Sequence, residues 1–363
     1  MQPSARQTMS NSILPPVLHV LPLTTIRRDR QLPVPGTISV RLNEKVQAQD
    51  IIADGELAPR RIFIDIARGL GIREKDVAQT LVHHPGDHLE SGDPIAGPVG
   101  VARRTVRAPS DGRIVAVSGG RVLFEVLAEP VSLRAGLPGL VISSDGSRSV
   151  TLEATGALIQ GVWGNGLEEY GMLRTVGGGA GDKMQTSQLD INLRGAVLIA
   201  GICDHPAPLH QATELSVRGL VLGSMPSELI PAARRLPYPL IVVEGFGDIP
   251  MNSAAYSLLT SNVGREAAVL AKTGDAYSFQ RPEVIIPLPA SRQTDLPDEV
   301  IPLKLGVRVR VVRAPYLGAV GVIRDLPSKA FDFPSGLLAR GATVELEGHG
   351  TRSVPLANLE VLN

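Results

Sequence analysis

One short pattern occurs twice in the sequence: residues 43–53 read NEKVQAQDIIA and residues 86–96 read GDHLESGDPIA, 43 positions further on. Each copy runs polar, acidic, basic, apolar, amide or acid, small, turn, Asp, any residue, Ile, Ala. The second copy is followed by VRAPSDGRIVAV at 106–117, where apolar residues alternate and Asp111-Gly112 provides a hairpin turn. The pattern indicates short, half-buried strands in a small β-sandwich made of two similar halves, neither of which buries its apolar face alone.

These runs resemble the half-motif of barrel-sandwich hybrid domains, the fold of biotinyl and lipoyl carriers. The resemblance implies such a domain over residues 31–130. A carrier presents its cofactor on a lysine at a hairpin tip, and this chain has no lysine between Lys75 and Lys183. We therefore expect a domain that keeps the fold for docking or scaffolding, and we expect no cofactor.

Composition limits the classes of protein to which the chain can belong. With 363 residues, 38 Gly, 29 Pro and 3% aromatic residues, it suits two or three domains of short strands and tight turns. Its 36 basic and 36 acidic residues create no overall field toward nucleic acid or anionic lipid. One cysteine excludes a disulfide framework and a cysteine-based zinc site. No run approaches the ~20 apolar residues of a membrane span, so we expect a cytoplasmic protein without a membrane partner, beginning with a flexible tail at 1–30.

Three continuous apolar runs follow in the middle of the chain, at 196–200, 220–222 and 240–243, separated by helix-length segments. Buried strands alternating with helices are typical of a parallel α/β sheet. We place this central domain at 191–288, after a β-rich connecting segment at 131–190. Ligands bind such sheets beyond the carboxyl ends of the strands, so the loops after the three runs are expected to share one edge.

The candidate ligand-binding residues lie in those loops: Asp204, His205, Ser224, Glu244, Gly245 and Gly247. Structural roles compete with this interpretation, because Asp204 is also suited to cap a helix and the glycines to form a tight turn. Cys203 with His205 or His210 resembles a nucleophile and base, but a buried cysteine at a strand end is the commoner case. The glycine cluster at 177–181, followed by Lys183, suggests a phosphate cradle. The Walker spacing is absent, so a flexible linker is favoured there.

A second resemblance lies near the carboxyl terminus, where residues 305–323 read LGVRVRVVRAPYLGAVGVI. This run resembles the KOW motif of SH3-like barrels in transcription elongation factors and ribosomal proteins. It implies a barrel at 303–363, after a proline-rich linker at 289–302. Alternation places Arg308 and Arg310 on one face, and a Tyr316-Leu317 turn offers an apolar contact. The four residues are candidates for partner binding.

The partner expected at this barrel is a protein or a ribonucleoprotein. Eight basic and five acidic residues at 301–363 give a net charge of only +3, so nucleic-acid binding is expected to be weak.

The sequence as a whole predicts a multidomain β-rich α+β protein: a barrel-sandwich hybrid, a central α/β parallel-sheet domain and a C-terminal SH3-like small barrel. The preferred function is a non-enzymatic adaptor or scaffold on a large cytoplasmic assembly, and the KOW resemblance implies transcription or translation machinery. The alternative is a ligand sensor or enzyme with its site at the central strand ends. No catalytic or metal-binding residue is assigned.

Overall fold

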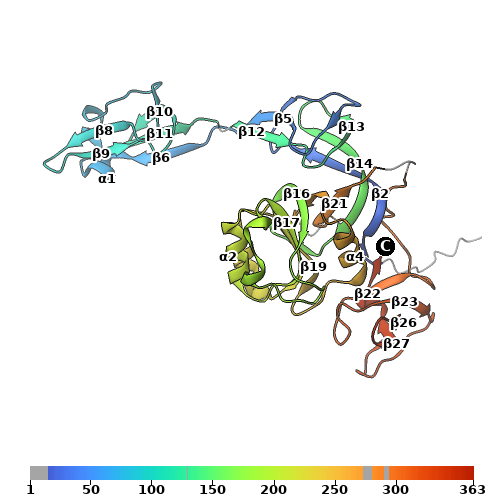
Figure 1. The fold of residues 1–363 in the computed structure, drawn as a ribbon. Helices are drawn as coiled ribbons and strands as arrows, with labels where there is room; N and C mark the ends of the chain where they lie inside the picture. The colour runs from blue at the N-terminus through green and yellow to red at the C-terminus, as the bar shows by residue number, and fades with distance from the viewer. Residues whose placement is uncertain (1–14, 129, 273–279, 290–293) are drawn as a thin grey trace, which may run out of the picture.

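The computed structural model describes residues 15–128, 130–272, 280–289 and 294–363, and strands dominate it. The β-rich, multi-sheet architecture predicted from the sequence is thereby confirmed. Figure 1 shows a body built on a large sheet, a small C-terminal β-unit beside it, and an arm that projects away from both. No helix in the described ranges has the length and apolarity needed to cross a membrane.

Two long strands, β2 (Val20–Gln31) and β14 (Ser149–Gln160), pair antiparallel along almost their whole lengths. Before them, β1 (Val17–Leu18) pairs in parallel with the last strand of the chain, β28 (Leu359–Leu362). The flexible tail predicted at 1–30 is therefore wrong for Val17 onward, while residues 1–14 lie outside the described ranges. Three arginines obscure the strand pattern of β2, and each has an acidic partner on another strand: Arg27 with Glu153, Arg28 with Glu283 and Arg30 with Glu168.

The two copies of the repeat lie in different structural units. The first copy forms β4 (Lys45–Val46) and β5 (Ile51–Glu56), which pair with β13 (Gly139–Ser144), β12 (Pro130–Arg134) and β3 (Gly36–Ile38) next to β14. The second copy forms β7 (His88–Leu89) and β8 (Pro94–Val99) in the arm. The copies therefore do not face each other in one sandwich, and the first unit continues beyond the boundary predicted at residue 130.

The arm spans β6 to β11 and has its own core around Ile95, Ile114 and Phe124, each of which is fully buried. Its sheet has the order β6-β11-β10-β7, with β8 and β9 forming a separate hairpin. The remaining arm elements are β6 (Arg61–Asp65), α1 (Ile66–Leu70), η1 (Glu74–Gln79), β9 (Arg104–Arg107), β10 (Gly112–Ser118) and β11 (Arg121–Val126).

The repeated pattern corresponds to a repeated turn. In the first copy the Asp50 carboxylate accepts a hydrogen bond from the Gln47 N–H at 2.7 Å, and in the second Asp93 accepts from Glu90 at 2.8 Å. The apolar positions of the copies also match, since Val46 and Leu89 are both buried. An acidic side chain that satisfies the N–H three residues earlier stabilises a tight turn. This turn accounts for the invariant Asp of the pattern.

The central domain contains four neighbouring parallel strands: β16 (Glu168–Thr175), β17 (Ala196–Ile202), β18 (Gly219–Met225) and β19 (Leu240–Phe246). The parallel pairing expected for the three apolar runs is present. Helices α2 (Pro206–Glu214) and α3 (Ile230–Ala233) pack on one face, and α4 (Ser253–Ser261) packs on the other. Short helical turns η2 (Thr186–Gln188), η3 (Ile191–Leu193) and η4 (Ser227–Leu229) complete the crossovers.

The same sheet continues through antiparallel strands on both sides. Strand β15 (Trp163–Gly164) pairs with β19, while β20 (Glu266–Leu270) and β21 (Glu283–Pro287) connect β16 to β14. Strands β14, β15 and β16 lie within the predicted connecting segment at 131–190. That segment is therefore part of the central sheet, because its strands supply the sheet's hydrogen-bonding partners.

The C-terminal unit, called the barrel below after the fold that the sequence predicts, is a small β-structure with its own core, which includes Val309, Val344 and Val361. Its strands are β22 (Arg308–Val311), β23 (Val320–Asp325), β26 (Gly341–Leu346), β27 (Gly350–Pro355) and β28, with η5 (Leu356–Asn358) before the last strand and a hairpin of β24 (Phe331–Asp332) and β25 (Leu338–Ala339). Part of the predicted linker at 289–302 is bound to the rest of the molecule. The Asp295 carbonyl accepts from the Thr25 N–H at 3.1 Å, and Ile301 packs on the C-terminal core; residues 290–293 lie outside the described ranges.

Candidate functional site at the carboxyl edge of the central sheet

The loops after β17, β18 and β19 share one edge of the sheet because the three strands are parallel. Backbone hydrogen bonds join them: the Cys203 N–H donates to the Ser224 carbonyl at 3.1 Å, and Gly247 donates to Met225 at 3.0 Å. This is the edge at which open α/β sheets usually bind ligands. The three loops therefore share one edge, as expected.

The glycine-rich segment at 177–183 lies directly on this edge. The Asp182 carbonyl accepts from the Ile202 N–H at 2.9 Å, and the Ala180 carbonyl accepts from Met251 at 3.0 Å. A Cβ on Gly201 would approach the Asp182 carbonyl to 2.5 Å, so only glycine allows the loop to lie this close. The segment is not the flexible linker that we predicted, because its backbone is hydrogen-bonded to the end of β17 and to the loop that follows β19.

A small group of charged residues remains on the outer surface of this edge. Lys183 Nζ lies 2.9 Å from Asp204 Oδ2 and 3.8 Å from Asp248 Oδ2. The hydrogen bond from Lys183 lowers the pKa of Asp204, and the same bond raises the pKa of Lys183. The His205 side chain is 77% exposed and lies 3.9 Å from Asp204 Oδ1. It is His205 that occupies the N-cap position of α2, without a side-chain cap, so the capping role considered for Asp204 is absent.

Ser224 and Glu244 point elsewhere and serve the structure. The Ser224 side chain is fully buried, and its Oγ accepts from the Ile249 N–H at 2.9 Å. Glu244 Oε1 accepts from the backbone N–H of Asn252 at 2.8 Å and from its side-chain amide at 2.6 Å. Gly245 and Gly247 have φ values of 142° and 128°, which suits the turn role considered for them. Of the six candidates, only Asp204 and His205 come together at the surface.

The other oxygen of Glu244 forms a buried ion pair with the barrel. Arg310 Nη1 lies 2.8 Å from Glu244 Oε2, and the two side chains are 3% and 0% exposed. Arg310 also pairs with Glu360, which in turn pairs with Arg281. The network therefore places two cations and two anions between the central domain and the barrel, where their charges cancel. Glu244 therefore lies at the interface between the central domain and the barrel.

Sequence reasoning missed Glu360, Arg281 and Asn252 in this network. A signal existed for one of them, since Glu360 stands alone among apolar residues in the final strand. The same signal applies to Glu244 in β19. A charged residue inside a buried strand requires an opposite partner, although the sequence does not show which residue supplies it.

Both arginines proposed to bind a partner contact the chain itself. Arg308 Nη2 lies 3.0 Å from Glu347 Oε1 and 3.4 Å from Ser253 Oγ on α4. Together with Arg310, it contacts the central domain, so alternation did place the two on one face, and that face is turned toward the chain's own central domain. Tyr316 is half-buried, with its ring 5.5 Å from that of His349. Leu317 remains 45% exposed, and it is the candidate that a partner can reach.

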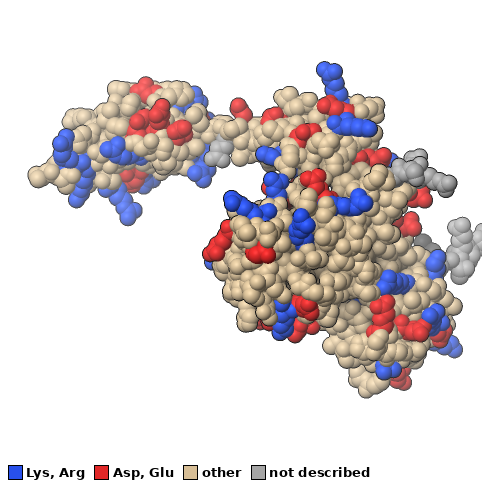
Figure 2. Space-filling view, viewed as in Figure 1, with Lys and Arg blue, Asp and Glu red and all other residues tan. Residues whose placement is uncertain are grey.

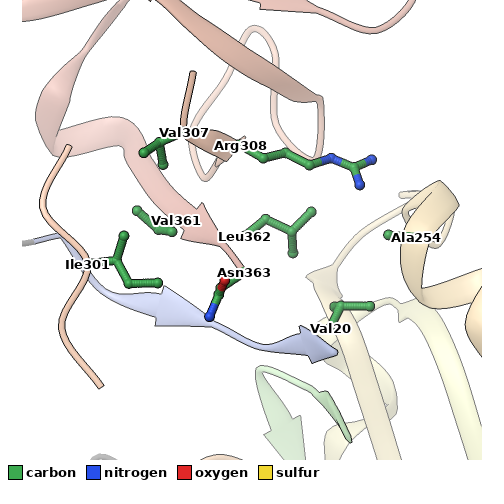
Figure 3. Close-up of a pocket in the computed structure, with 8 residues that line it drawn as sticks. All are labelled: Val20, Ala254, Ile301, Val307, Arg308, Val361, Leu362 and Asn363. Carbon is green, nitrogen blue, oxygen red and sulfur yellow. The ribbon is translucent and has the colours of Figure 1, made fainter. Parts of the chain in front are cut away.

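Two cavities lie between the central domain and the barrel. The larger, about 280 Å³, lies where α4 and the start of β2 meet the end of the chain (Figure 3), and its lining residues are Val20, Ala254, Ile301, Val307, Arg308, Val361, Leu362 and Asn363. The smaller, about 170 Å³, is lined by the Glu244, Arg310 and Glu360 charges and by Val162, Leu317 and Gly318, among others. Neither of these two cavities is lined by Asp204 or His205.

Cys203 provides a direct test of the nucleophile hypothesis. Its thiol is fully buried and donates to the His205 carbonyl at 3.2 Å, and burial raises its pKa to about 12. Because the thiolate is the reactive form, we expect the native chain to resist an aromatic disulfide reagent at pH 8 and the unfolded chain to react fully. Rapid stoichiometric labelling of the native chain would restore Cys203 as a candidate nucleophile.

The described part of the chain contains no cluster of three or more His, Cys, Asp or Glu side chains that could hold a metal ion. The charged groups at the sheet edge are paired with one another, and those beneath it are paired with the barrel. No protein-family model matches the chain, and no curated protein matches its sequence.

Proposed function

We propose that this protein is a non-enzymatic adaptor that docks on a large cytoplasmic assembly. The observation that supports this proposal is the use made of the carboxyl edge of the central sheet. The chain's own glycine-rich loop is hydrogen-bonded to the end of β17 and to the loop after β19, and Glu244 binds the barrel's Arg310. A sheet whose usual ligand edge holds another domain of the same chain suits a scaffold better than an enzyme.

The surface beside the smaller cavity is suited to a protein partner. Leu317 and Val162 both line that cavity. The next residue, Trp163, contacts Phe246 edge to face at 6.0 Å, and Phe246 is 37% exposed. The buried Arg310 has two carboxylate partners, so it offers no uncompensated charge to a phosphate. Apolar and aromatic residues around a neutral centre favour a protein contact.

The charge distribution supports the same partner class. Figure 2 shows acidic and basic side chains interspersed over the visible face of the body and barrel. Strong nucleic-acid binding requires a concentration of basic side chains that face the backbone phosphates. The resemblance of residues 305–323 to the KOW motif supports an assembly of the transcription or translation machinery as the place where the protein docks.

A small-ligand sensor is the second candidate, because the exposed Lys183 and Asp248 and the partly exposed Asp204 lie at the usual ligand edge. Affinity purification of the tagged full-length chain from its native host, followed by mass spectrometry, distinguishes the adaptor from the sensor.

We expect Leu317→Asp to lower recovery of protein partners by about tenfold, because it places a charge in a partly desolvated contact. Leu338→Asp is the matched control, since Leu338 is 65% exposed on the same barrel and does not line the cavity. If Leu317→Asp recovers its protein partners as the wild type does, while Asp204→Ala recovers fewer of them, the result would favour the sensor.

A further inference from the structure

Strand β6 forms one edge of the arm's four-stranded sheet. It pairs with β11 on one side, and no other described strand pairs with it. Figure 1 shows β6 along the lower margin of the arm, where the arm extends beyond the body. An exposed edge strand is a template for pairing with another chain, and proteins normally protect such an edge.

The backbone of β6 has groups oriented for such pairing. The Arg60 carbonyl accepts from Val126 at 2.9 Å, and the Ile66 N–H donates to Gly120 at 3.1 Å, so both ends of the strand are bonded toward the β11 side. Hydrogen bonding alternates along an antiparallel strand. The even-numbered residues of β6 therefore bond to β11, and the N–H and C=O groups of Arg61, Phe63 and Asp65 point to the open side.

The side chains of β6 also indicate a missing neighbour. Phe63 is 74% exposed in the middle of the strand. Ile62 and Ile64 face the arm's core but are only partly buried, whereas Phe124 and Val122, opposite them on β11, are fully buried. The apolar layer of the arm therefore reaches its open edge without being covered there.

We propose that a second copy of this chain covers this edge, with the two β6 strands antiparallel about a twofold axis at Phe63. The strand reads Arg-Ile-Phe-Ile-Asp, so this register places Arg61 opposite the partner subunit's Asp65. Phe63 then lies opposite the same residue of the second copy. Opposite charges directly across a strand pair stabilise it, and like charges destabilise it. The three outward-facing positions become three residue pairs, each exchanging two backbone hydrogen bonds.

The order of charges selects a second copy over an unrelated strand. A sequence with a cation at one end, an anion at the other and an aromatic residue at its centre is complementary to its own antiparallel image, as a twofold interface requires. Both charged side chains retain exposed surface despite their internal contacts. Arg61, which pairs with Glu125, is 60% exposed, and Asp65, which caps α1 through the Arg68 N–H, is 41% exposed. This inference goes beyond the proposed adaptor function, because it does not involve the barrel or its partner.

Sedimentation analysis of the full chain tests the arrangement by exchange of charges. The wild-type chain is expected to form a dimer that dissociates on dilution. Arg61→Asp and Asp65→Arg each place like charges at both ends of the paired strands, so each should raise the dissociation constant by about tenfold or more. An equimolar mixture of the two variants restores opposite charges at both ends and should form a heterodimer. A mixture of two folded variants that stays monomeric would overturn the proposal, as would a wild-type chain that is monomeric at every concentration.

Two further variants separate dimerisation from folding. Phe63→Glu alters no internal cap or ion pair, and we expect it to yield a monomer with an unchanged circular dichroism spectrum. Val101→Asp is the matched control, because Val101 is fully exposed on the same arm but lies outside β6, and we expect it to dimerise like the wild type. Dimerisation of Phe63→Glu with wild-type affinity would exclude β6 as the interface. Loss of the host partner in the Leu317→Asp experiment has no bearing on this result.

Discussion

Replacement of Arg310 by alanine is expected to lower the free energy of unfolding by about 3–5 kcal/mol, because removing one member of a buried ion pair leaves its partners uncompensated. Glu244 and Glu360 would remain buried as two carboxylates, with Arg281 as the one cation left in the network. Denaturation by urea, followed by circular dichroism, measures the change. The affected transition should be the one in which the barrel separates from the central domain.

Arg308→Ala is the matched control for this experiment. Arg308 lies two residues away on the same strand and also pairs with a glutamate, but its side chain is 38% exposed and that of Glu347 is 57% exposed. Exposed pairs contribute about 0–1 kcal/mol, because solvent screens them. Equal losses for the two substitutions would show that burial of the Arg310 network does not determine its contribution.

Phe124→Ala is expected to unfold the arm selectively, at a cost of about 3–5 kcal/mol for the cavity created. Phe124 is fully buried at the centre of the arm's core, which shares no buried residue with the cores of the body and barrel. Limited proteolysis should therefore cleave the variant within residues 61–126 and leave the body and barrel intact. Val101→Ala on the same arm should change stability by less than about 0.5 kcal/mol, because Val101 is fully exposed. Cleavage throughout the chain would contradict an independently folding arm.

The parts of the fold that sequence reasoning anticipated are those specified by local pattern. The apolar run at Ala196 to Ala200 indicates a strand buried on both faces, because no polar residue interrupts it, and β17 lies there. The repeat likewise identified two equivalent turns, since an Asp that bonds to the N–H three residues earlier is a local interaction. Because the three apolar runs were expected to form parallel strands, the loops that follow them were expected to share one edge of the sheet.

The remaining features depend on contacts between residues far apart in the sequence. Glu244 and Arg310 are 66 positions apart, and nothing near either residue indicates that they meet. A polar residue at a strand end is typical of both a ligand site and a domain interface, and here the second role applies. Residues 20–30 were assigned to a tail because three prolines interrupt the apolar run at 13–23, and the arginines of β2 obscure its strand pattern. Those arginines are accommodated by acidic residues from distant strands.

The connection between the arm and the body determines which changes in chain length the fold can tolerate. Glu56, at the end of β5, lies opposite Pro130, at the start of β12, so the chain leaves the body and returns to it at adjoining positions. A segment whose two ends meet on one hairpin can be lengthened, exchanged or removed without altering the pairing beneath it. The same junction is where a foreign domain can be grafted.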